Sequence, residues 1–359
     1  MQGSLADAEL DSLLITHLPN IRYLTGFTGS SAVVVVDEKR CVIFTDGRYR
    51  SQAQEEVQGA KIVVAAKSPL MAAAEWLLES PARGRRSKAK SYLTVGIESE
   101  SISAAARDRV AAQLKGKARL RSAPQFIEHA RMVKDAAEIG RIRQAVELGA
   151  SLFKVAMRKI RPGVPEVEVA GAMEYAARQS GADGMAFPTI LASGTRSAII
   201  HGRASQARIP ARGFVVCDFG VILAGYCSDR TRTFHVGKPT ADARHLYASV
   251  LEAQQAAIQA VRPGATAAEV DAAARNVLKR QKLDRYFTHS TGHGLGLEIH
   301  EAPRLALGQD QRLESGMVIT IEPGAYVPGK WGVRIEDVVV VTSTGCEVLS
   351  PTSKDLVVI

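Results

Sequence analysis

The amino-acid sequence predicts a mixed α/β (α+β) protein of two domains, a small N-terminal α/β domain followed by a larger domain built from a duplicated half. The chain of 359 residues is longer than most single domains. Short strand-like runs alternate with helix-like runs over roughly the first hundred residues. In the second half of the chain, the tripeptide Arg-Pro-Gly occurs twice, at 161–163 and at 262–264.

The N-terminal region contains strand-like runs separated by helix-like runs. The strand-like runs are short and rich in β-branched residues, and they cover residues 13–16, 32–36, 41–45, 61–65 and 93–97. The helix-like runs have apolar residues at helical spacing and cover residues 49–56, 70–78 and 104–114. A boundary near Ala123–Pro124 divides the chain into domains of residues 1–123 and 124–359. One or two amphipathic linker helices are expected over about 127–159.

The larger domain carries a weak internal repeat. Each Arg-Pro-Gly tripeptide is followed at the same offset by Glu-Val, at 168–169 and at 269–270. Each copy ends one helix with a Pro-Gly stop signal and then begins another helix. The shared register of both elements predicts a duplicated half with pseudo-two-fold symmetry.

Composition narrows the class of protein. Apolar residues make up 46% and charged residues 23% of the chain, which is typical of a soluble globular protein. No stretch approaches the roughly 20 apolar residues of a membrane span, and the N-terminus lacks the features of a signal peptide. The cysteines are scattered without a Cys-x-x-Cys pair, which predicts free thiols in a reducing cytoplasm. We therefore expect a cytoplasmic protein without a membrane partner.

The net charge of +9 raises the question of a nucleic-acid partner. Much of the clustered charge lies in the stretch Arg-Gly-Arg-Arg-Ser-Lys-Ala-Lys at 83–90. This stretch lacks the interleaved aromatic residues that would stack on bases. We interpret it as a solvated surface loop and expect no nucleic-acid partner.

Candidate metal ligands lie in the second half of the chain, each in a local context that would hold it still. They are Asp218, Asp229, His293, Glu322 and Glu336. Asp218 and Glu322 each end an apolar run, where an unpartnered carboxylate would be costly to bury. Four carboxylates and one imidazole form a hard, oxygen-rich ligand set that is suited to divalent ions.

The neighbours of these residues support a common site. Asp218 and Asp229 are joined by a turn around residues 224–225, a spacing that can bring two carboxylates to adjacent positions in a β-hairpin. His293 is surrounded by glycines, which permit close backbone approach. Glu336 interrupts the apolar run 333–341, with Arg334 two residues before it on the same face of a strand.

These motifs, in this order, resemble the metal-dependent pita-bread peptidases, and within them the proline-specific Xaa-Pro aminopeptidases and Xaa-Pro dipeptidases (prolidases). The resemblance covers nearly the whole chain. The segments 23–32 and 45–49 are similar to the N-terminal domain of the creatinase and aminopeptidase P group. The resemblance implies a creatinase-like N-terminal domain, a pita-bread catalytic domain and a homodimer.

The resemblance also implies roles for individual residues. The candidate ligands would bind two divalent metal ions, with Mn²⁺ favoured by the oxygen-rich set and Co²⁺ or Zn²⁺ as alternatives. A hydroxide bridging the ions would attack the carbonyl carbon before proline, and Glu322 would carry a proton to the leaving nitrogen. The resemblance assigns catalytic contacts with the substrate and the tetrahedral intermediate to His201 and His300. It places His289 and Phe187 at the substrate pocket, and Arg334 behind Glu336, which it would orient.

The substrate length stays open between two activities. A dipeptidase needs a cation to bind the proline carboxylate, and Arg304 could be that cation or a solvated loop residue. The segments at 26–32 and 46–49 are more similar to aminopeptidase P. The sequence therefore favours an Xaa-Pro aminopeptidase, with an Xaa-Pro dipeptidase as the alternative. A metal-free pita-bread binding module is a remote alternative, because all the ligand positions are filled.

Overall fold

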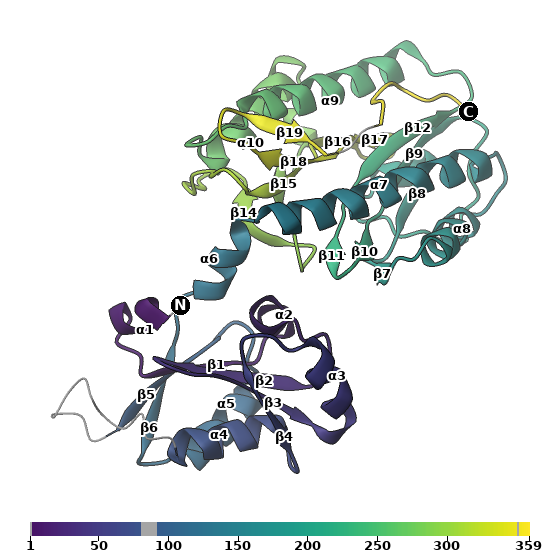
Figure 1. Ribbon diagram of the computed structural model, residues 1–359. Coiled ribbons are helices and arrows are strands. Elements are labelled where there is room, and N and C mark those ends of the chain that lie inside the picture. The colour runs from purple at the N-terminus through teal and green to yellow at the C-terminus, as the bar shows by residue number, and fades with distance from the viewer. Residues whose placement is uncertain (1, 80–91, 350–351) are drawn as a thin grey trace. The chain divides into compact units, whose positions relative to one another are not determined.

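The computed structural model describes residues 2–79, 92–349 and 352–359. The chain divides into two compact units, Met1–Arg131 and Met132–Ile359. Each unit combines helices and strands, as the sequence predicts (Figure 1). The basic stretch at 83–90, which we interpret as a surface loop, lies outside the described residues. Within those residues, none of the helices is both long and apolar enough to span a membrane.

The N-terminal unit is built on a six-stranded sheet with the strand order β4-β3-β2-β1-β5-β6. The strands are β1 (Ser12–Ile15), β2 (Ala32–Asp37), β3 (Cys41–Asp46), β4 (Lys61–Ala65), β5 (Leu93–Ile97) and β6 (Ala118–Ser122). The helices are α1 (Gln2–Asp7), α2 (Leu18–Thr25), α3 (Arg50–Glu56), α4 (Pro69–Glu79) and α5 (Ala104–Gln113), with a 3₁₀ turn η1 (Gly47–Tyr49).

Both faces of this sheet are covered, which explains why its central strands are largely apolar. Successive side chains of a strand point to opposite faces. Leu14 and Val33 accordingly pack with α4 and α5, which Figure 1 shows together beneath the sheet. Leu13 and Val34 pack on the opposite face with residues of α2 and α3.

Two helices follow the N-terminal sheet along the chain, α6 (Phe126–Met132) and α7 (Ala136–Lys159). The start of α7 is fixed by a capping box. The Asp135 carboxylate accepts the backbone N–H of Glu138 at 2.8 Å, and the Glu138 carboxylate accepts the backbone N–H of Asp135 at 2.9 Å. The helix then buries one apolar stripe, as expected for an amphipathic helix of this length.

The C-terminal unit contains three further long helices and several small antiparallel sheets. The helices are α8 (Glu166–Gln179), α9 (Ala241–Ala260) and α10 (Ala267–Arg280), with 3₁₀ turns η2 (Gly194–Ala198) and η3 (Asp284–Tyr286). The strands are β7 (Gly184–Met185), β8 (Ile190–Ser193), β9 (Gly213–Asp218), β10 (Val221–Leu223), β11 (Tyr226–Cys227), β12 (Thr231–Val236), β13 (Gly292–Gly294), β14 (Glu301–Leu305), β15 (Val318–Ile321), β16 (Gly324–Val327), β17 (Trp331–Arg334), β18 (Asp337–Val341) and β19 (Cys346–Val348).

The internal repeat read from the sequence is present in the fold of this unit. In each half, two long helices pack together, α7 with α8 and α9 with α10, against antiparallel strands. The strand order β12-β9-β8 in the first half corresponds to β18-β15-β13 in the second.

The turns between the paired helices are also equivalent. Gly163 and Gly264 have φ values of +84° and +83°. The carbonyl oxygen of Gly163 accepts Nη1 of Arg208 at 2.8 Å, and that of Gly264 accepts Nη1 of Arg312 at 2.7 Å. These matching hydrogen bonds confirm the predicted duplication.

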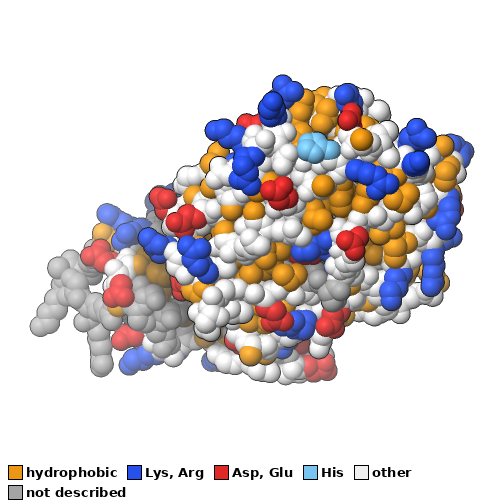
Figure 2. Space-filling view, turned by 90° about the horizontal axis from the view of Figure 1, so that it is seen from above, with side chains coloured by type: hydrophobic (Ala, Val, Ile, Leu, Met, Phe, Trp, Pro, Cys, Tyr) orange, Lys and Arg blue, Asp and Glu red, His pale blue; other side chains and the backbone are white. Residues whose placement is uncertain are grey.

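Charged side chains on the surface show no single basic patch in the view of Figure 2. Lys and Arg side chains are scattered there among apolar and acidic side chains. On this face, the positively charged side chains of the described residues are therefore dispersed.

Candidate metal centre

The predicted ligand residues lie at the ends of strands in the C-terminal unit or within a short strand there. Asp218 is the last residue of β9, and Glu322 directly follows β15. Asp229 lies in the connection between β11 and β12. Glu336 lies between β17 and β18, and His293 is the middle residue of β13.

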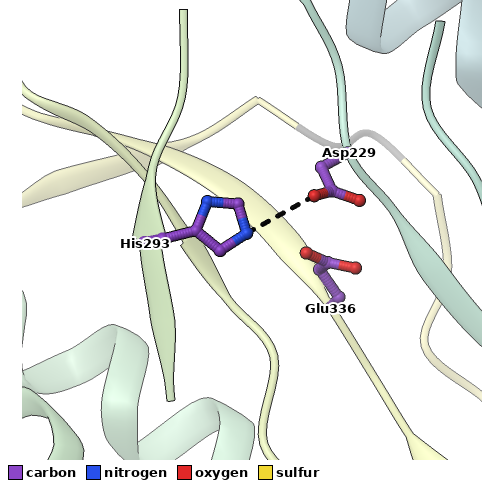
Figure 3. Close-up of side chains that lie close together, drawn as sticks. All are labelled: Asp229, His293 and Glu336. Carbon is purple, nitrogen blue, oxygen red and sulfur yellow. Dashed lines mark ion pairs between the residues drawn. The ribbon is translucent and has the colours of Figure 1, made fainter. Parts of the chain in front are cut away.

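Three of these side chains point toward one another (Figure 3). Ligand atoms of Asp229, His293 and Glu336 all lie within 4.8 Å of one another. His293 Nε2 is 3.6 Å from Oδ2 of Asp229 and 3.4 Å from Oε1 of Glu322. The structure therefore brings together four of the five residues by direct distance. Asp218 is linked to Glu336 through Arg334 and Thr231.

The imidazole of His293 is oriented for metal binding. Its Nδ1 lies 2.9 Å from the carbonyl oxygen of Gly294. Because a carbonyl only accepts, Nδ1 carries the proton, and the lone pair of Nε2 faces the carboxylates. Burial lowers the pKa of His293 to about 4, so the ring is neutral near pH 7. A neutral imidazole fixed by a hydrogen bond at its other nitrogen is the usual form of a histidine ligand.

The glycines on either side of His293 are required by close backbone contacts. A Cβ atom at Gly292 would overlap the carbonyl oxygen of Thr320, and one at Gly294 would overlap that of Ala302. Neighbouring strands therefore pass too close for any side chain at either position. This crowding holds the His293 backbone in place between β14 and β15.

Asp218 and Glu336 each use one carboxylate oxygen in a hydrogen bond within the protein and leave the other oxygen available to a metal ion. Oδ2 of Asp218 accepts Nη2 of Arg334 at 2.5 Å, and Oε2 of Glu336 accepts the hydroxyl of Thr231 at 2.7 Å. Within the described residues, Asp218 Oδ1 and Glu336 Oε1 are buried and have no hydrogen-bond partner. A buried carboxylate oxygen is normally satisfied by a donor or a cation, so this donor set fits a divalent metal ion.

The pKa values of the buried carboxylates also indicate a site for divalent cations. Burial raises the pKa of Asp229 and of Glu336 well above their usual range, and the neighbouring carboxylates raise both further. Burial also raises the pKa of Glu322 to about 8. Such a group of buried carboxylates carries a large uncompensated cost when ionised, which bound cations would remove.

The strands around the site differ from the prediction in two respects. The apolar run 333–341 is not one strand, because β17 pairs with β16 while β18 pairs with β15. The chain leaves one sheet and enters another at Glu336, so Arg334 and Glu336 do not share a strand face. Arg334 contacts Asp218, and its hydrogen-bonded connection to Glu336 runs through Thr231, to which its Nε donates at 3.0 Å. The cross-strand partner of Asp218 is likewise Thr231 and not Asp229.

The predicted accessory histidines lie around the ligand group. The His300 ring meets the His293 ring edge to face, with centroids 4.4 Å apart. Burial lowers the pKa of His300, with a further effect of the His201 charge, and Asp218 opposes both. His289 is connected to Arg334 through Tyr326. Arg334 Nη1 donates to the phenol oxygen at 2.7 Å, and this oxygen lies 3.0 Å from His289 Nε2.

The remaining predicted site residues, Phe187 and Arg304, are close to the same group. A Cβ atom at Gly220, two residues after Asp218, would lie 3.1 Å from Phe187. Arg304 is exposed on β14 and is the direct cross-strand partner of His293. Directly paired residues of antiparallel strands project to the same face, so Arg304 and His293 share one.

Sequence reasoning missed three hydroxyl-bearing residues that organise the site. Thr231 supports Glu336, Thr320 accepts the backbone N–H of His293 at 3.0 Å, and Tyr326 joins Arg334 to His289. A signal exists for the threonines, since each lies two residues from a predicted ligand, and Thr320 is the one polar residue of the strand Val318–Ile321. Tyr326 carries no comparable signal.

Comparison with known proteins covers nearly the whole chain. The model of metallopeptidase family M24 matches residues 140–343, and that of the creatinase/prolidase N-terminal domain matches residues 1–133. An Xaa-Pro dipeptidase of Pyrococcus horikoshii is 35% identical over 354 residues, which cover 97% of this chain and 95% of the relative.

Solved structures agree with these matches. An Xaa-Pro dipeptidase from Bacillus anthracis superposes with a TM-score of 0.93 at 37% identity, covering 100% of this chain and 98% of the other. An X-Pro aminopeptidase from Thermotoga maritima superposes with a TM-score of 0.88 at 33% identity, covering 98% of each chain. The protein is therefore an enzyme of the metallopeptidase class that uses divalent metal ions and acts on peptides. It belongs to metallopeptidase family M24 and carries the creatinase/prolidase N-terminal domain of the proline-specific pita-bread enzymes.

Proposed function

We propose that the protein is an Xaa-Pro dipeptidase, a prolidase that cleaves dipeptides with proline in second position. This is the alternative and not the first choice of the sequence prediction. It is supported by the Xaa-Pro dipeptidases among the relatives and solved structures. The observation that carries it is the position of Arg304, an exposed cation directly opposite His293 in the sheet. A cation there can bind the free carboxylate of a dipeptide.

We assign metal binding to the five predicted ligands. These are Asp218, Asp229, His293, Glu322 and Glu336. Two divalent ions, most suitably Mn²⁺ for an oxygen-rich set, would supply Lewis-acid activation of water and of the scissile carbonyl when bound. Glu322 would carry a proton to the proline nitrogen, which must be protonated before it can leave.

The histidines and Phe187 would bind and orient the dipeptide. His300 lies beside His293, so it can donate a hydrogen bond to the developing oxyanion together with His201. His289, held by Tyr326, would form one wall of the pocket. Phe187 would supply an apolar surface near Asp218 for the proline ring.

A second candidate is the Xaa-Pro aminopeptidase that the sequence favours. The N-terminal segments at 26–32 and 46–49 support it, as does the X-Pro aminopeptidase structure from Thermotoga maritima. This enzyme would leave the carboxyl side of proline open for a longer chain, so Arg304 would have no carboxylate to bind.

Hydrolysis of a length series tests the proposal. We would measure proline release from Xaa-Pro dipeptides, and cleavage of the Xaa-Pro bond in Xaa-Pro-Yaa peptides of increasing length, with Mn²⁺ supplied. Activity confined to dipeptides is the expected result. Efficient cleavage of the longer peptides would replace the dipeptidase with the aminopeptidase. No cleavage of either series, with no metal bound, would overturn both.

Replacing Arg334 with lysine is expected to weaken Mn²⁺ binding about 10- to 100-fold, the usual effect of losing a residue that orients a metal ligand. Lysine keeps the charge but cannot contact Asp218, Tyr326 and Thr231 at once, as the guanidinium does. Calorimetric titration of the metal-free protein with Mn²⁺ measures this. An affinity equal to that of the wild type would show that Arg334 does not orient the site.

We further propose that the enzyme is a cytoplasmic homodimer. The support is the resemblance to the family and, for the cytoplasm, the scattered cysteines without a disulfide pair. Light scattering coupled to size-exclusion chromatography would contradict the dimer if the mass matched 38.5 kDa.

A further inference from the structure

Each half of the C-terminal unit contains a fully buried carboxylate that the metal centre does not use. Glu166 is the first residue of α8, and Asp271 lies in the first half of α10 (Figure 1). Both are 0% exposed. Burying a carboxylate is costly unless hydrogen bonds and opposite charges compensate it, so the partners of each group indicate what it holds.

Glu166 joins the two ends of the segment that carries His201. One carboxylate oxygen accepts the backbone N–H of Ser193 at 2.8 Å and its hydroxyl at 2.9 Å. The other accepts the backbone N–H of Ser205 at 3.2 Å and its hydroxyl at 2.8 Å. Arg196 adds an ion pair at 3.1 Å. The Glu166 side chain thus binds both ends of the segment between the two serines.

Asp271 holds the approach to the metal ligand His293. Its Oδ1 accepts the backbone N–H of Thr291 at 3.1 Å and its hydroxyl at 2.7 Å. Arg275 donates to the same carboxylate at 2.6 and 3.1 Å. Thr291 precedes His293 by two residues, and its carbonyl oxygen accepts the backbone N–H of Glu322 at 2.8 Å. Asp271 therefore acts on both proposed ligands through Thr291, which lies close to His293 in the chain and is hydrogen-bonded to Glu322.

The two arrangements are built alike. In each, a carboxylate on the second helix of the half takes both the N–H and the hydroxyl of one residue, Ser193 or Thr291, together with an arginine. Charge-assisted bonds of this kind are short and directional, so they fix the backbone that they hold. The segments that they fix differ, because one carries a proposed substrate contact and the other carries proposed metal ligands.

We propose that Glu166 and Asp271 are positioning residues with separate duties, Glu166 setting the His201 segment for the substrate and Asp271 setting His293 and Glu322 for the metal. This inference rests on the proposed function for the role of His201. The division of duties distinguishes it from a general contribution to stability, which would affect substrate and metal binding alike.

The test compares Glu166→Gln and Asp271→Asn with a matched control, Asp37→Asn. Asp37 is a buried carboxylate of the N-terminal unit that accepts the backbone N–H groups of Lys39 and Arg40 at 2.9 and 2.8 Å and also binds the Arg40 side chain. Each full-length variant is characterised by its melting temperature, by its Mn²⁺ affinity from calorimetry without substrate, and by kcat and KM for an Xaa-Pro dipeptide at saturating Mn²⁺.

Asp271→Asn is expected to weaken Mn²⁺ binding about 10- to 100-fold. Glu166→Gln is expected to keep Mn²⁺ affinity within about twofold and to lower kcat/KM about 10- to 100-fold, the cost of a small misplacement near the reacting atoms. Asp37→Asn should lower only the melting temperature. The inference would be overturned if Glu166→Gln and Asp271→Asn changed Mn²⁺ affinity and kcat/KM equally. It would also be overturned if the two variants lowered the melting temperature and changed neither Mn²⁺ affinity nor kcat/KM.

A second pair of variants tests the same contact in case Asp271→Asn does not fold. Thr291→Val keeps the shape and the N–H but removes the hydroxyl donor, whereas Thr291→Ser keeps both donors. Mn²⁺ affinity should fall for valine and not for serine, and equal affinities would contradict the role of Asp271. If the wild type binds Mn²⁺ but cleaves no Xaa-Pro substrate, the proposed function alone fails. Mn²⁺ affinity then decides the inference, since only a loss in Asp271→Asn without one in Glu166→Gln supports it.

Discussion

Replacing Glu336 with glutamine is expected to abolish peptidase activity and, at the same time, to raise the melting temperature of the metal-free protein. The loss of activity follows from the loss of a proposed ligand, because Lewis-acid stabilisation of several kcal/mol corresponds to about 10³-fold in rate or more. The gain in stability follows from the burial of the carboxyl group, which is 1% exposed and leaves Oε1 without a partner among the described residues.

The sign of the stability change comes from the pKa of this group. Folding raises the pKa of Glu336 through burial and through the charges of Glu322 and Asp218. A carboxyl whose pKa rises on folding destabilises the fold at every pH above its unfolded pKa of about 4.3. A neutral glutamine removes this cost near pH 7, and its oxygen can still accept the hydroxyl of Thr231. A gain of about 1 kcal/mol would raise the melting temperature by about 2–4 °C.

Thermal unfolding with and without Mn²⁺ measures both effects. The wild type should gain about 2.7 kcal/mol at a Mn²⁺ concentration 100 times the dissociation constant, whereas the variant should gain little. Glu314→Gln, which neutralises an exposed carboxyl of the same unit, serves as the control and should behave as the wild type. A variant that keeps the full Mn²⁺-induced shift would show that Glu336 is not a ligand.

Five of the six strands of the N-terminal sheet, β1 to β5, were predictable because each of these carries its own hydrophobic signal. The runs that became β1 to β5 agree with the predicted ranges within one residue at each end, since apolar side chains fill both faces of these strands. The sequence does not predict β6, which contains two arginines and lies at the edge of the sheet with most of its residues exposed. Its sequence, Ala-Arg-Leu-Arg-Ser, contains a single large apolar residue, so its hydrophobic pattern is weak, whereas the other edge strand, β4, contains Ile-Val-Val and is predicted. The helix α2 also goes unpredicted.

The sequence indicates candidate site residues one by one but does not predict how the strands arrange them. Asp218 and Glu322 are recognisable because a carboxylate at the end of an apolar strand needs a reason to be there. A run of apolar residues does not show which strand it pairs with, so the sequence does not predict the break between β17 and β18. For the same reason, the sequence could not show that Thr231 supports a carboxylate 105 positions further along the chain.

Replacing Arg304 with alanine is expected to lower kcat/KM for an Xaa-Pro dipeptide about 10- to 150-fold. This corresponds to the loss of a charge-assisted hydrogen bond worth about 1.5–3 kcal/mol, at about 1.4 kcal/mol for each factor of ten. For the matched Xaa-Pro amide, which has no terminal carboxylate, kcat/KM should change little. The ratio of the two values, measured at saturating Mn²⁺, should therefore fall toward one in the variant.

The comparison of acid and amide isolates the carboxylate because both substrates place the same scissile bond at the site. A structural role of Arg304 would lower both values equally, and a solvated loop residue would change neither, which would favour the aminopeptidase. Arg304→Lys gives a graded control, since lysine keeps the charge but loses the planar fork that binds a carboxylate with two hydrogen bonds. Its ratio should lie between those of the wild type and the alanine variant. Because Arg304 is exposed on β14, its removal should leave the fold and Mn²⁺ affinity intact.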